Sequence, residues 1–348
     1  MKKLMILAAA AIAVAACSKT YDAKPEGKSE IGFGTWTENL TKDEARVQGT
    51  STFLAGDTFA VYGYKVNNST NDVVFDDVVV TASGSGTLTW GYSPKRFWDQ
   101  SATSYTFYAV SPSAIGTAAT VDAETGEVAS ASITFAGSDN DILVADKKEV
   151  LPAAYNTKVP LVFNHIASLV DFKVKKHTNL GDAVLAITSF SISNIDSVGT
   201  FSVSDAYTND HPVVTWTESA YGTYTNASGV TSVTLPTAVT TSGNDLIDSL
   251  VVMPQAFRSA ANSDSNVQAV NIAYTITDED SNVNTFTSSF ELKLFDSVDD
   301  DDNADTIVES WEAGKHYTFY ITINANVIEF SASITDWTAV NGYNYLVQ

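Results

Sequence analysis

The stretch KHYTFYITINANVIEFSASITD, residues 315–336, decides the fold class of this chain. Apolar side chains recur at every second position on both sides of Asn324-Ala325-Asn326, and they are Tyr317, Phe319, Ile321, Ile323, Ile328, Phe330, Ala332 and Ile334. A period of two is the spacing of a β-strand with one buried face, and a short polar break between two such runs is typical of a hairpin. The stretch therefore predicts a hairpin with one face in a core, and a slip of one residue would put that whole face in water.

The same alternation recurs in earlier parts of the chain, at residues 170–175, 190–192, 270–276 and 286–294. Residues 53–112 form short runs rich in Val, Tyr and Phe, divided by Gly, Asn, Asp and Pro, and Ile31, Phe33 and Trp36 predict a first strand. We find no convincing helical stripe longer than three turns. We therefore expect an all-β protein with two β-sandwiches, at residues 31–166 and 167–348, the second ending in one or more terminal strands.

Residues 1–16 carry the pattern of a secretory signal peptide, with Lys2 and Lys3 before an apolar run. Small residues then precede Cys17, and this ending resembles the lipobox of bacterial lipoproteins, in which the signal is cut before a cysteine that becomes lipidated. The alternative is an ordinary signal peptide with an incidental cysteine. Because Cys17 is the only cysteine, it has no partner for an intrachain disulfide or a thiol metal site. Residues 17–30 are polar, and we expect them to be a tether between lipid and domain.

The charge balance excludes some classes of partner. The chain has 41 acidic and 19 basic residues, which gives a formal net charge of -22. Such a surface repels phosphate backbones, so we expect no nucleic-acid partner, and it also disfavours docking on anionic lipid.

The search for catalytic and metal-binding patterns favours no enzyme and no cofactor. His165 lies in apolar sequence, which indicates a satisfied core histidine, and the other histidines are scattered. The acidic loop at residues 296–305 partly matches a calcium loop, but Ala304 stands where that loop needs Gly and Glu309 is one residue short of the closing position. We therefore expect a solvated acidic loop and no metal. The tryptophans mostly sit in strand patterns, where core packing is their usual role, although an exposed ring could stack on a sugar.

Several segments together are similar to the fimbrillin family, the subunits of donor-strand-assembled pili of Gram-negative bacteria. The segments that carry this resemblance are Phe53 with residues 56–62, and residues 92–98, 105–109, 161–167, 311–317 and 334–337. The resemblance implies two tandem transthyretin-like β-sandwiches in a lipoprotein precursor. It also implies a cut after Arg46, before Val47, that removes the first strand. A strand from the C-terminal region of another subunit would then fill the place, and the candidate residues here are Tyr343, Tyr345 and Val347.

The resulting expectation is a structural subunit of cell-surface fimbriae that supports adhesion. We expect it at the outer membrane through lipid on Cys17, with other fimbrial subunits and a host or bacterial receptor as partners. Its place as stalk, anchor or tip stays open. The alternative is a glycan-binding surface lipoprotein, and an exported enzyme ranks last.

Overall fold

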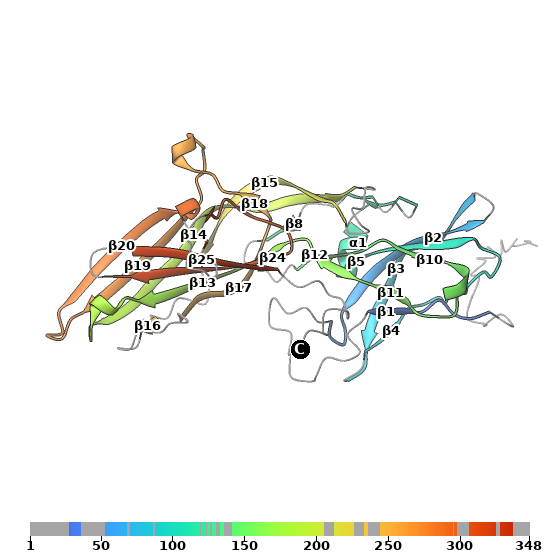
Figure 1. Ribbon diagram of the computed structural model, residues 1–348, viewed down its shortest axis with the longest axis horizontal. Helices are drawn as coiled ribbons and strands as arrows, with labels where there is room; N and C mark the ends of the chain where they lie inside the picture. Colours follow the sequence, from blue (N-terminus) through green and yellow to red (C-terminus); the bar gives the residue numbers. More distant parts are fainter. Residues whose placement is uncertain are drawn as a thin grey trace, which may run out of the picture.

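The computed structural model describes residues 28–35, 53–67, 70–85, 88–118, 120–122, 124–125, 127–129, 133–135, 141–204, 212–225, 233–235, 244–294, 296–297, 306–324 and 328–336. Strands make up nearly all of their regular structure, and the one α-helix among them is the short α1 (Ser113–Ala118). Figure 1 shows two β-rich halves placed end to end, with β2, β3 and β5 in one and β13, β19 and β24 in the other. The predicted all-β class is confirmed.

A seven-stranded antiparallel sheet forms the first half, in the order β12-β9-β5-β2-β3-β4 with β10 also paired to β5. Its strands are β2 (Thr58–Asn67), β3 (Thr70–Ser83), β4 (Thr89–Gly91), β5 (Ser104–Ser111), β9 (Leu143–Ala145), β10 (Lys148–Val150) and β12 (Phe163–His165). Successive side chains of a strand point to opposite faces. The sheet therefore buries Phe59 and Phe107 in one apolar cluster, and Tyr62 and Tyr108 in another.

Two further sheets pack face to face in the second half. The six-stranded sheet contains β13 (Ser168–Lys176), β17 (Asn244–Val252), β21 (Asp296–Ser297), β22 (Thr306–Ile307), β24 (Lys315–Ile323) and β25 (Ile328–Asp336). The eight-stranded sheet contains β6 (Thr120–Val121), β7 (Val128–Ala129), β8 (Ile133–Thr134), β14 (Val184–Val203), β15 (Val214–Thr225), β16 (Val233–Leu235), β19 (Ala269–Thr277) and β20 (Val283–Glu291). Between them, the Phe172 ring stacks on Phe319 at 4.8 Å and lies 5.2 Å from Phe190.

The long strand β14 joins the two halves. Its first part lies in the second core, while Phe201 and Val203 near its end pack with Tyr62 and Tyr108 of the first half. The same part of β14 pairs with β7 and β8, which precede β9 in the chain. In Figure 1 the ribbon of β15, which pairs with β14, runs along the top of the molecule toward α1. One apolar cluster is thus shared by both halves.

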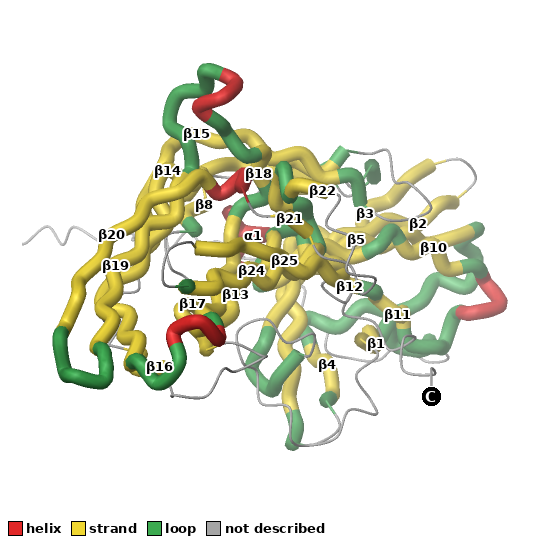
Figure 2. The backbone as a smooth tube through the Cα atoms, turned by 60° about the vertical axis from the view of Figure 1, so that its left-hand side comes forward, coloured by secondary structure: helices red, strands yellow, loops and turns green. Residues whose placement is uncertain are grey.

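Two small pairs of strands complete the topology. The first joins β1 (Phe33–Thr35) in parallel to β11 (Val159–Leu161), and the second joins β18 (Gln255–Ala256) to β23 (Ser310–Trp311). The tube in Figure 2 shows β1 and β11 side by side. Short 3-10 turns lie at η1 (Pro152–Ala154), η2 (Thr178–Leu180), η3 (Ala260–Asn262) and η4 (Leu292–Leu294).

The predicted terminal hairpin is confirmed in β24 and β25. Their antiparallel register places Tyr317 opposite Ile334 and Ile323 opposite Ile328. The apolar residues of β24, from Tyr317 to Ile323 at every second position, are at most 2% exposed. The prediction is wrong at Ile334, which lies two residues from the end of β25 and is 42% exposed, so the buried face of the strand does not extend to its end.

The division into residues 31–166 and 167–348 remains a proposal. The first sheet ends with β12 and the six-stranded sheet begins with β13, on either side of Ile166 and Ala167. However, β6, β7 and β8 belong to the sheet of β14, so residues 120–134 contribute strands to the second half.

Candidate functional site: the leading segment in the first core

The leading segment, residues 28–35, crosses the first core as an extended chain. Ile31 and Phe33 alternate with Gly32 and Gly34, so both large side chains point the same way. Ile31 is 0% exposed and Phe33 is 2% exposed. The predicted first strand is thereby confirmed, and it is a core element rather than a surface strand.

Main-chain hydrogen bonds hold the segment on both of its edges. On one edge Val159 N donates to Gly32 O at 2.8 Å, beside the parallel pairing of β1 with β11. On the other edge Trp98 N donates to Ser29 O at 3.0 Å and Ile31 N donates to Arg96 O at 2.9 Å. The segment therefore lies between two backbone edges that pair with no other strand among the described residues.

Aromatic rings of the first core pack against the segment, and we call the rings around Phe33 the bed of the groove. The Phe33 ring meets four others at centroid distances of 5.3–6.1 Å, and these are Phe59, Phe75, Tyr92 and Phe107. Edge-to-face and tilted contacts at such distances stabilise aromatic pairs beyond simple burial. Burying the Phe33 side chain contributes about 1.5–3 kcal/mol from its removal from water alone.

Tyr92 adds a polar contact inside this bed. Its hydroxyl donates to Ile31 O at 2.6 Å, and the residue is 7% exposed. Burial raises the pKa of the Tyr92 hydroxyl to about 12, so it keeps its proton at physiological pH. Outside the bed, Lys95 pairs with Glu30 at 2.6 Å, but this pair is half-exposed and contributes little.

Removal of the leading segment would leave a groove with exposed aromatic rings and with main-chain amide groups that lack hydrogen-bond acceptors. The four rings around Phe33 would lose their cover, and the amide groups of Val159 and Trp98 would lose their acceptors. Both losses cost free energy in water, and an added β-strand repairs both at once. The arrangement is thus a strand-accepting site, occupied here by the chain's own leading segment.

The predicted processing and assembly residues lie outside the described residues. They are Cys17, Arg46, Val47, Tyr343, Tyr345 and Val347. The described chain stops at Thr35 and resumes at Phe53, which is 6% exposed and packs 5.2 Å from Phe163. Arg46 therefore belongs to the connection between two buried points of the same core.

His165 is a core residue, as the sequence predicts. It is 4% exposed, and its Nδ1 lies 2.9 Å from Asp141 Oδ1. Of the acidic loop, only β21 is described, and among the described residues no cluster of three or more His, Cys, Asp or Glu could hold a metal. Within the same part of the chain, no helix is long and apolar enough to cross a membrane.

Two of the four described tryptophans are buried, and the other two are partly buried against the cores. Trp98 and Trp311 are at most 1% exposed, and Trp216 donates from Nε1 to Ile166 O at 2.8 Å. Trp90 lies 4.7 Å from the Phe59 ring. These four rings therefore pack against the cores, whereas Trp36 and Trp337 lie outside the described residues.

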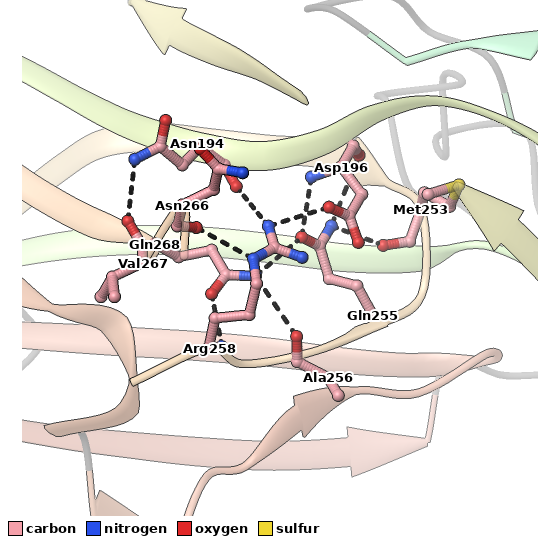
Figure 3. A network of polar contacts seen from close by, with 9 residues as sticks. All are labelled: Asn194, Asp196, Met253, Gln255, Ala256, Arg258, Asn266, Val267 and Gln268. Atoms are coloured by element: carbon pink, nitrogen blue, oxygen red, sulfur yellow. Dashed lines mark hydrogen bonds and ion pairs between the residues drawn. The ribbon is translucent and has the colours of Figure 1, made fainter. Parts of the chain in front are cut away.

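A buried polar network, missed by sequence reasoning, fastens residues 253–268 to β14 (Figure 3). Arg258 Nη2 lies 2.9 Å from Asp196 Oδ1 and donates to Asn194 O at 2.6 Å. Gln255 Oε1 accepts from Asp196 N at 2.8 Å, and Gln268 Oε1 accepts from Arg258 N at 2.6 Å. Burial raises the pKa of the Asp196 carboxyl, although the Arg258 guanidinium opposes the shift. No local motif marks this network, because its residues meet only in the folded chain.

The fold and the site define a class of β-protein whose first core is completed by an extended strand. The model of the fimbrillin-like family matches residues 45–337, so the chain belongs to that family. No curated protein matches the chain.

Two solved structures share the fold. A fimbrial protein from Bacteroides vulgatus has a TM-score of 0.56 at 16% identity, over 89% of this chain and 99% of its own. A candidate cell adhesion protein from Bacteroides uniformis has a TM-score of 0.52 at 18% identity, over 90% of this chain and 100% of its own. At such identities the likeness shows the fold alone.

Proposed function

We propose that this protein is a structural subunit of cell-surface fimbriae that supports adhesion. It is exported as a lipoprotein through Cys17, loses its leading segment by a cut after Arg46, and polymerises when a strand of another subunit takes the vacated place. The observation that carries the proposal is the position of Ile31 and Phe33 inside the first core, joined to it by the connection that contains Arg46. Membership of the fimbrillin-like family supports it.

A surface position follows from the proposal. The partners are other fimbrial subunits, the outer membrane through the lipid on Cys17, and a host or bacterial receptor. The glycan-binding alternative has less support, because Trp98 and Trp311 are buried, and Trp90 and Trp216 are partly buried against the cores.

Limited trypsin treatment of the secreted chain tests the proposal. We expect a cut before Val47 and oligomers that survive mild detergent, because the emptied groove is unstable in water. Because trypsin also cuts after Lys42, the matched control is the double variant Lys42→Gln/Arg46→Gln, whose connection between residues 35 and 53 should stay uncut and which should stay monomeric. A product that starts at Val47 and stays monomeric at high concentration would contradict the proposal.

A further inference from the structure

The edge formed by residues 96–98 holds the leading segment through an unusual ladder. In an antiparallel pair, two residues that face each other exchange both of their main-chain hydrogen bonds. Here Ile31 N donates directly to Arg96 O at 2.9 Å, but the return bond is not direct. Instead Arg96 N donates to the Tyr92 hydroxyl at 3.2 Å, and that hydroxyl donates to Ile31 O at 2.6 Å.

The Tyr92 hydroxyl is held in place by the packing of its ring. The ring lies 5.5 Å from Phe75 and 5.7 Å from Phe33, and the Lys95 ammonium sits 4.8 Å above it. Phe33 leaves with the segment, but the contacts with Phe75 and Lys95 stay and restrict the movement of the Tyr92 ring. This chain of hydrogen bonds from Arg96 N through the Tyr92 hydroxyl, which we call the Tyr92 relay, therefore belongs to the bed of the groove. It would contact the backbone of any strand that enters the groove.

Arg96 O and the Tyr92 hydroxyl together favour one of the two directions in which a strand could run along the groove. Arg96 O only accepts, so the occupant must present an N–H there and then a C=O at the hydroxyl, as Ile31 does. A strand that runs the other way presents these groups in the opposite order. Its carbonyl would then face Arg96 O, and two buried acceptors without a proton between them cost free energy.

The opposite edge agrees with this direction. β1 runs parallel to β11, with Phe33 opposite Val159 and Thr35 opposite Leu161. Once the direction is fixed, an incoming strand must place an apolar side chain at the position of Ile31 and, two residues later, an aromatic side chain at the position of Phe33.

Under the proposed function, the strand that fills this groove is the tail of a second copy of this chain, residues 340–348. We propose that Tyr92 sets the direction and register of that strand, so that it runs parallel to β11. In this register Tyr343 takes the seat of Ile31, Tyr345 that of Phe33, and Val347 the position of Thr35. The inference rests on the proposed function.

The tail suits the groove by pattern, charge and length. VNGYNYLVQ contains no charged side chain, so none has to be desolvated in the apolar bed. Its large side chains at positions 343, 345 and 347 repeat the spacing of Ile31, Phe33 and Thr35. It is also long enough to cover the span of residues 28–35.

The test uses the full chain with a specific protease site placed at residues 42–47. After cleavage, labelled peptides compete with the leading segment: the tail peptide 340–348, and as reference a peptide of residues 28–36. We expect the tail peptide to displace the segment.

The Tyr92→Phe variant should weaken binding of the tail peptide about fivefold to tenfold, since one buried hydrogen bond is lost and Arg96 N is left without its acceptor. The control is Tyr155→Phe, which also loses a buried hydroxyl bond, to Ala102 O at 3.0 Å, and should leave peptide binding within about twofold.

Direction is measured with a nitroxide on Lys95→Cys, because Lys95 contacts Glu30 near the start of the segment. A second nitroxide is placed at either end of the tail peptide. In the proposed register Glu30 corresponds to the third residue of the peptide. We therefore expect the distance to the peptide C-terminus to exceed the distance to its N-terminus by about 13 Å, from the rise of an extended chain. In Tyr92→Phe the two orientations should mix.

The outcomes separate the inference from the proposed function. A tail peptide that binds in the reverse or in both directions, or a Tyr92→Phe effect equal to that of Tyr155→Phe, overturns the inference and leaves the groove intact. Binding of the 28–36 peptide alone overturns the assignment of the tail. Failure of both peptides to displace the segment overturns the proposed function as well.

Discussion

At the scale of single residues, Phe33 holds the leading segment in the first core. Phe33→Ala would remove the ring that four others surround and leave a cavity, since the bed is also fixed by its own packing. We expect a loss of about 3–5 kcal/mol in the free energy of unfolding, measured by urea denaturation. Phe286→Ala, at a ring that is 38% exposed, is the control and should cost about 1 kcal/mol or less. Equal losses in both variants would show that Phe33 is not an anchor.

Arg258 makes a second residue-scale prediction, which depends on pH. Because burial raises the pKa of Asp196, the folded state binds this proton more tightly than the unfolded chain. The contribution of the carboxyl to stability is therefore complete below its unfolded pKa of about 4, and is lost as pH rises through the folded pKa. Arg258→Met removes the group that opposes the shift, so the pKa rises further and the loss extends to higher pH.

We expect the cost of Arg258→Met to increase from pH 4 to pH 7, where an unpaired buried carboxylate costs about 3–5 kcal/mol. The control is Lys293→Met, whose partner Glu309 is 70% exposed and whose ion pair should contribute less than about 1 kcal/mol. Urea denaturation at both pH values measures the difference. A cost of Arg258→Met that is the same at pH 4 and pH 7 would contradict this account of Asp196.

At the scale of elements, the sequence predicts strands well and their partners poorly. The period of two locates β13, β24 and the segment with Ile31 and Phe33, because one buried face is enough to impose it. It does not say which strand lies beside which, so the pairing of β7 and β8 with β14 is visible only in the fold. α1 is likewise absent from the prediction, since six residues are too few to show a helical stripe.

The polar parts of the sites escape sequence analysis for a related reason. The Tyr92 relay depends on a hydroxyl that reaches a carbonyl on a segment distant in the chain. The network of Asp196 and Arg258 likewise joins positions on different strands and loops. Side-chain groups in such arrangements carry no periodicity, whereas the apolar bed of Phe33 follows from alternation and composition.

Gly199 lies where β14 and β15 approach so closely that no side chain would fit, and this gives a prediction at the scale of elements. It lies in β14 at a register shift against β15, and an added Cβ would lie 2.7 Å from Thr217 O and press on Met253 Sδ. Met253 is 1% exposed and the carbonyl belongs to the neighbouring strand, so neither moves freely. We expect Gly199→Ala to destabilise the protein by about 1–3 kcal/mol in urea denaturation.

The matched control is Gly91→Ala in β4, where an added Cβ meets nothing within 4 Å. It should change stability by less than about 0.5 kcal/mol. If Gly199→Ala is as mild as this control, then β14 and β15 separate more easily than their register indicates.

At the scale of the whole molecule, the cluster shared by both halves makes them one mechanical unit. The first sheet carries the bed of the leading segment on one face and the shared cluster, with Tyr62 and Tyr108, on the other. Phe201 of β14 packs into that cluster at 5.3 Å from Trp216. In a fimbria assembled as proposed, load on the groove would pass through this single sheet to the second half.

The coupling of the halves leads to a calorimetric prediction about Phe201. We expect one unfolding transition for the intact chain, because the shared cluster cannot be exposed without loss to both halves. Phe201→Ala weakens the joint and should split this transition into two. Phe190→Ala is the control, since Phe190 lies in the same strand and is equally buried, but belongs to the core of the second half alone. It should lower the midpoint by a similar amount and keep one transition. Two transitions in the unmodified chain, or a split in both variants, would mean that the halves are joined by the chain alone and that load passes through a flexible connection.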